Sequence, residues 1–90
     1  MKFALMYNES EQIQGAEILA IKDKVDDLIP IAMDKLKELV EANEPGKTLE
    51  QCFEEKEIWE ESSNRLLPKN VKAWQYNDYE HELYIQKVEI

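Results

Sequence analysis

The stretch LIPIAMDKLKELVEAN, residues 28–43, decides the fold class more than any other part of the chain. Its apolar residues recur at spacings of three and four, which places them on one face of an α-helix. They are Ile29, Ala32, Met33, Leu36, Leu39 and Val40. Before them, Asp26 or Asp27 can cap the helix, and Pro30 is expected in the first turn, where a missing N–H is tolerated. We therefore predict an amphipathic helix over 28–43.

A second helix is expected to follow, over 49–63. The segment 43–47 contains a Pro-Gly pair and ends the first helix with turn chemistry. Thr48 and Gln51 then have the spacing of a capping box, in which each side chain bonds to the backbone of the other residue. The apolar side of this helix consists of Leu49, Cys52, Phe53 and Trp59.

Strands are predicted on both sides of the helices. Residues 2–8 alternate with Phe3, Leu5 and Tyr7 on one side, which is a strand pattern. Two further strand patterns, over 71–76 and 83–90, are separated by a polar turn and indicate a hairpin.

The segment 16–21 has two interpretations. It is a strand that pairs with 2–8, or its isoleucines continue at helical spacing into the next element. Gly15 and Pro30 weaken the helical interpretation, so we favour the strand.

These elements predict one α+β domain over 1–90, in the order β-β-α-α-β-β. An antiparallel sheet of about four strands would carry two helices on one face. The N-terminal pattern through 28–43 and the closing segment 84–90 resemble small prokaryotic and phage proteins of uncharacterised function. That resemblance implies an N-terminal hairpin, an amphipathic helix and a C-terminal strand, and it implies no functional residue.

Composition excludes several classes of function. Twenty acidic residues against eleven basic ones give a net charge of −9. Nucleic acids and anionic membranes are bound through clusters of Lys and Arg, and the chain has one arginine, Arg65. We therefore expect neither partner. One cysteine and no recognisable secretion signal lead us to expect a cytoplasmic protein.

Catalytic, cofactor and metal sites are not expected either. Cys52 lies on the apolar side of its predicted helix, which indicates a small buried side chain rather than a nucleophile. His81, the one histidine, falls in a predicted turn and is expected to be exposed. Trp74 is expected in the core, and Tyr79, in the same turn as His81, at a protein interface.

The candidate binding site is an acidic row on the second helix. Glu50, Glu54, Glu57 and Glu61 fall within an arc of about 60° when each residue turns ~100°. Ile58 would project beside them, so that an anionic row adjoins an exposed apolar side chain. The alternative is an ordinary solvated helix face.

The sequence therefore predicts a non-enzymatic protein-binding or regulatory domain whose partner has a basic surface. A phage-type accessory or inhibitor protein is the most concrete form of this hypothesis. A self-associating domain is the alternative, with a homodimer formed by a free strand edge at 1–8 or 83–90. A small enzyme subunit that uses carboxylates is a further alternative.

Overall fold

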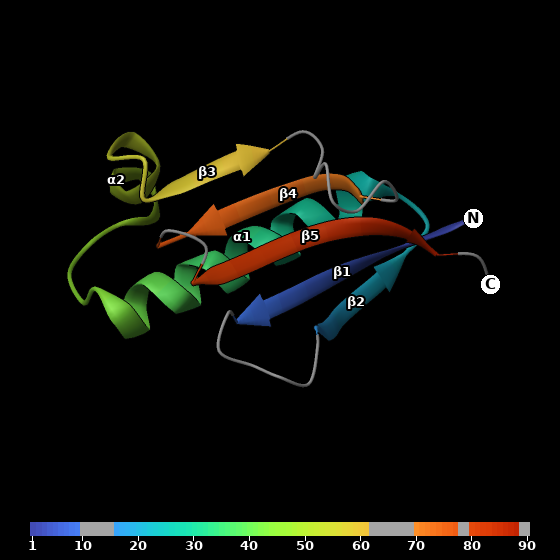
Figure 1. Ribbon diagram of the computed structural model, residues 1–90, viewed down its shortest axis with the longest axis horizontal. Coiled ribbons are helices and arrows are strands. Elements are labelled where there is room, and N and C mark those ends of the chain that lie inside the picture. Colours follow the sequence, from blue (N-terminus) through green and yellow to red (C-terminus); the bar gives the residue numbers. More distant parts are fainter. Residues whose placement is uncertain (10–15, 62–69, 78–79, 89–90) are drawn as a thin grey trace.

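Five strands and two helices make up the fold, which is described by a computed structural model (Figure 1). The structure describes residues 1–9, 16–61, 70–77 and 80–88. The elements are β1 (Lys2–Glu9), β2 (Glu17–Lys22), α1 (Val25–Asn43), α2 (Leu49–Glu54), β3 (Ile58–Glu61), β4 (Asn70–Tyr76) and β5 (His81–Val88).

The strands form one antiparallel sheet in the order β2-β1-β5-β4-β3. The predicted α+β class is confirmed, with five strands in place of about four. Segment 16–21 is a strand that pairs with β1, as favoured above, so the helical interpretation is wrong. The edges expected to be free are not. The described residues of 1–8 and 83–90 contribute to the inner strands β1 and β5, and the outer strands are β2 and β3.

The first helix begins earlier than predicted, at Val25. Lys24 is its N-cap residue and makes no side-chain capping bond. Asp26 and Asp27 lie in the first turn instead, where negative charge is favoured by the partial positive charge of the helix N-terminus. Pro30 consequently lies inside the helix rather than in its first turn.

The second helix begins as predicted and ends much sooner. Thr48 and Gln51 form the expected capping box, but α2 stops at Glu54. Lys56 has a positive φ of 63°, which is a left-handed conformation that a right-handed α-helix does not contain. The chain then enters β3, where Ile58 pairs with Tyr76 of β4. The prediction of a helix over 49–63 is therefore wrong for residues 55–61, and residues 62–63 lie outside the described part of the chain.

The core lies between one face of the sheet and the helices. Figure 1 shows α1 running along one side of the sheet, behind the strands in this view. The strand side chains facing it are Leu5, Tyr7, Ile58, Trp74, Tyr76, Leu83 and Ile85, all buried. From α1 they meet Leu28, Ala32, Leu36, Leu39 and Val40, and from α2 they meet Cys52. The predicted core role of Trp74 is confirmed, because its side chain is 2% exposed.

We call the opposite side of the sheet the open face, because no described helix packs on it. Residues paired across antiparallel strands point to the same face, so the register assigns its members. The described ones are Lys2, Ala4, Met6, Asn8, Ile18, Ile21, Trp59, Ala73, Gln75, Glu82, Tyr84, Gln86 and Val88. Lys2 and Glu82 are the charged residues among them, although the chain as a whole is 34% charged.

A β-bulge in β2 shapes the edge of the open face. Met6 pairs with Ile18 and Leu5 with Ala20, so Leu19 is an extra residue in the ladder. The bulge sends Ile18 and Ile21 to the same face, although three residues separate them. They are 58% and 44% exposed, which is unusual for isoleucine in a folded protein.

Candidate functional site

The predicted acidic row does not form. Glu50 and Glu54 are exposed on α2, whereas Glu57 lies in the connection after it. Glu61 belongs by its backbone to β3. Because these positions lie on a helix, a connector and a strand, they share no face.

The prediction that Ile58 projects into solvent beside this row is also wrong. Ile58 is 1% exposed and packs in the core, so it offers nothing to a partner. Tyr79 lies outside the described residues.

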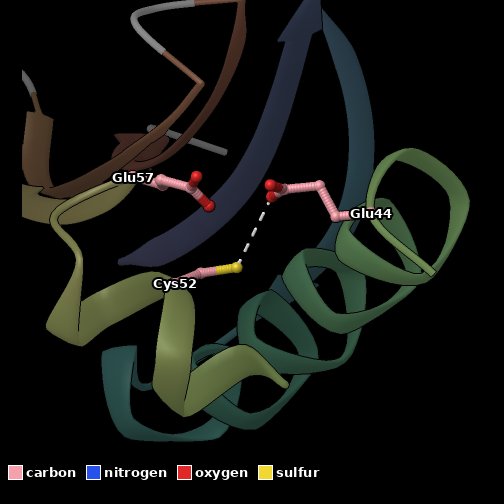
Figure 2. Close-up of side chains that lie close together, drawn as sticks. All are labelled: Glu44, Cys52 and Glu57. Carbon is pink, nitrogen blue, oxygen red and sulfur yellow. Dashed lines mark hydrogen bonds between the residues drawn. The ribbon is translucent and has the colours of Figure 1, made fainter. Parts of the chain in front are cut away.

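Side chains converge instead near the C-terminal end of α1, in a group that we call the Glu44 cluster (Figure 2). It consists of Glu44, Cys52 and Glu57, and one carboxylate oxygen of each glutamate and the thiol sulfur all lie within 4.8 Å of one another. Glu44 is the C-cap residue of α1, and Cys52 comes from the middle of α2. Glu57 is held by backbone bonds to Cys52 and Asn77, both of 2.9 Å. Three separate segments therefore meet at this point.

Glu44 accepts hydrogen bonds from two buried groups. The Tyr76 hydroxyl donates to Glu44 Oε2 at 2.7 Å, and the Cys52 thiol lies 3.7 Å from the same oxygen. The tyrosine bond stabilises the carboxylate, so it is the main reason that the pKa of Glu44 is lowered. Burial, followed by this bond, raises the pKa of Tyr76. The hydroxyl thus stays protonated as a donor.

Lys47 supplies the positive charge of the cluster. Its Nζ lies 3.0 Å from Glu57 Oε1 and 3.4 Å from Glu44 Oε1, and it also contacts Glu55. Hydrogen bonds to Glu55 and Glu57 raise the pKa of Lys47, so the ammonium remains charged. Together these contacts join the end of α1 to α2 and to the start of β3.

A thiol and two carboxylates are also a ligand set that Zn²⁺ accepts. Two features of the cluster oppose metal binding. Lys47 already occupies carboxylate oxygens of Glu44 and Glu57, and the thiol must lose its proton to become a ligand. Burial raises the pKa of Cys52 to about 11, so the neutral thiol is the stable form at neutral pH. These contacts form a structural junction between α1, α2 and the start of β3.

The thiol of Cys52 should react slowly in the folded protein. Cys52 is 0% exposed, which confirms the predicted buried side chain, and its pKa is about 11. Because the thiolate is the reactive species, an aromatic disulfide reagent at pH 8 should label the native protein far more slowly than the protein in denaturant. Equal rates in the two conditions would show that this part of the core is open to solvent.

His81 is the residue whose environment the sequence reasoning missed. It begins β5 and is 8% exposed, so the expectation of an exposed turn residue is wrong. The Tyr7 hydroxyl donates to Glu9 Oε1 at 2.8 Å and lies 2.8 Å from His81 Nδ1. A hydroxyl has one proton to donate, so His81 Nδ1 carries the hydrogen of the second bond. Nε2 is then buried without a hydrogen-bond partner.

This network is closed to substrates. Tyr76 is the cross-strand neighbour of His81 and stacks on it, with ring centroids 5.5 Å apart. A general base must be within reach of the proton that it removes, and Nε2 is not accessible. No local signal predicts this burial, because Tyr7 is 74 residues away and meets His81 through the sheet.

The open face remains as the candidate binding surface. At its centre, Ala4, Met6, Ala73 and Gln75 are buried. Ile18 and Ile21 lie at its β2 side and are both partly exposed to solvent. Aligned apolar side chains on a mostly uncharged sheet face are suited to contact with another protein.

Neither described helix has both the length and the apolar character needed to cross a membrane.

Comparisons with known proteins add no family. No protein-family model, curated protein or solved structure matches this chain.

Proposed function

We propose that the protein is a small non-enzymatic domain that binds another protein through the open face of its sheet. The observation that carries this proposal is the exposure of Ile18 and Ile21, at 58% and 44%, on one face. Through the register they adjoin Met6 and Ala4 of β1, and Met6 in turn adjoins Tyr84 of β5. Apolar and aromatic side chains of this kind anchor protein interfaces.

Binding would move the exposed parts of the two isoleucines out of water. Burying an isoleucine side chain fully contributes about 1.5–3 kcal/mol. Two partly exposed isoleucines therefore offer a gain equivalent to at least about tenfold in affinity. Among the described side chains of this face, Lys2 and Glu82 carry the charges that would have to be desolvated on binding.

We propose a partner with an apolar centre and a cationic rim. The net charge of −9 attracts a cationic protein over a distance and speeds its association. The mostly uncharged open face then supplies the contact itself. An accessory or inhibitory role, in which the domain covers a surface of its partner, fits this division between steering and contact.

The test uses two variants with the same net charge. Replacing Ile18 and Ile21 together by Asp changes the charge by −2, and so does Lys37→Asp on the exposed side of α1. Wild type and both variants are immobilised, exposed to a lysate of the source cells and eluted with salt, and a protein captured by the wild type is purified. We expect its affinity to fall at least about tenfold for Ile18→Asp/Ile21→Asp and to be kept by Lys37→Asp.

Charge alone predicts the opposite order. A cationic partner held only by electrostatic attraction would bind Ile18→Asp/Ile21→Asp at least as well as the wild type. That result, with circular dichroism showing that the variant is folded, would contradict docking on the open face.

A further inference from the structure

The outer edge of β2 has no neighbouring strand among the described residues. A strand at the edge of a sheet presents unpaired N–H and C=O groups, which are a template for another strand. Natural proteins commonly protect such edges with charged side chains, proline, inward-pointing charges or β-bulges. β2 contains a bulge, but its charged residues Glu17 and Lys22 stand at the two ends, and the four residues between them are apolar.

The sequence of β2, EILAIK, would pair favourably with a second, antiparallel copy of itself. Two copies laid antiparallel about a twofold axis between residues 19 and 20 place Glu17 opposite Lys22 of the second copy. Ile18 then lies opposite Ile21 of the second copy, and both charged pairs join opposite signs. Opposite charges and apolar residues facing each other across strands stabilise a sheet.

In this register, the β-bulge allows paired side chains of the two copies to point to the same face of the sheet. Paired residues must point to the same face, and in a regular strand residues three apart point to opposite faces. The bulge sends Ile18 and Ile21 to the open face. It sends Glu17 and Lys22 to the helix side, as their pairing with Tyr7 and Phe3 shows. The order of faces along β2 therefore reads the same in both directions.

From this match we propose that β2 pairs with the β2 of a second copy of the chain, joining two sheets into one. Four isoleucines then lie together at the centre of a continuous open face. The net charge of −9 on each copy opposes this pairing only weakly. Charges are screened beyond about 8 Å at physiological ionic strength. Each copy has a radius of gyration of 12.8 Å, so most charges of the two copies lie farther apart than that.

Pairing of a six-residue edge covers a small area. Interfaces below about 1,200 Å² in total belong to weak, transient complexes. We therefore expect a monomer at low micromolar concentration and a dimer at high micromolar concentration. This inference does not depend on the proposed function, because the dimer would form without any other partner.

Sedimentation velocity on three variants tests the register. Lys22→Glu would face Glu17 of the second copy with a like charge, and we expect its dissociation constant to rise at least about tenfold. The double variant Glu17→Lys/Lys22→Glu restores both pairs and has the wild-type net charge, so its dimer should return. Lys37→Glu changes the charge as Lys22→Glu does, but on α1, and should dimerise like the wild type.

Three outcomes would overturn the inference. They are a wild type that stays monomeric at high micromolar concentration, a dimer that Lys22→Glu leaves intact, and a double variant that remains monomeric. In the dimer, backbone amides of 18–21 should also exchange with solvent more slowly as concentration rises. If Lys22→Glu abolishes the dimer while capture of a partner persists, the edge pairing and the proposed function are shown to be separate.

Discussion

Replacing Ile58 by alanine should lower the free energy of unfolding by about 2–5 kcal/mol. Ile58 is 1% exposed, pairs with Tyr76 and belongs to the core cluster. Removing its side chain takes apolar atoms from the core and leaves a cavity that the neighbouring rings fill only in part. Equilibrium denaturation in urea, with the slope held in common between variants, measures the effect.

The matched control is Ile21→Ala. It removes the same atoms from a strand, at a position that is 44% exposed. Less transfer free energy is lost there and no enclosed cavity is left, so its effect should be well below that of Ile58→Ala. A neutral or stabilising Ile58→Ala would instead agree with an exposed helical position, since alanine is the better helix former. It would contradict the assignment of β3.

Trp74→Ala should cost about 3–5 kcal/mol in the free energy of unfolding. The indole is 2% exposed and sits on β4, between β3 and β5, facing α1. Its ring also lies 5.9 Å from Lys72 Nζ, which adds a weak cation–π contact. Thermal unfolding followed by circular dichroism measures the loss.

The control for this variant is Trp59→Ala. Trp59 belongs to β3 at the other edge of the sheet, is half-buried and points to the open face. Its truncation should therefore cost clearly less than that of Trp74. If the two losses were equal, the open face would have to be covered as the helix face is.

The parts of the fold that sequence predicted are those set by local patterns. The spacing of Leu36, Leu39 and Val40 placed one side of α1 against the sheet, and these residues are buried. Alternation predicted β1, and the capping box at Thr48 predicted where α2 begins.

The part that was missed depends on a distant strand. Acidic residues recur at helical spacing over 49–63, which predicts one face of a single long helix. Acidic residues four apart repel each other in a helix, and α2 has no basic residue in its last turn to favour its C-terminal end. Ile58 and Trp59 gain more by pairing with Tyr76 and Gln75. The local sequence pattern does not indicate this strand pairing, because Tyr76 and Gln75 lie on a distant strand of the sheet.

The candidate sites differ from the sequence prediction for the same reason. In the Glu44 cluster, Glu44 accepts a hydrogen bond from Tyr76, which lies on β4. His81 is buried because Tyr7 lies beside it on β1. The exposure of Ile18 and Ile21 results from a bulge, which depends on pairing with β1. None of these contacts has a signal within a single segment.

One face of the sheet is open and carries the exposed Ile18 and Ile21, while Ile58 is enclosed on the other face. Methyl NMR with a soluble paramagnetic agent measures this directly at low protein concentration. We predict that the signals of Ile18 and Ile21 lose most of their intensity, while those of Ile58 and Ile85 keep it. Protection of Ile18 and Ile21 to the level of Ile58, or strong loss at Ile58, would contradict the account.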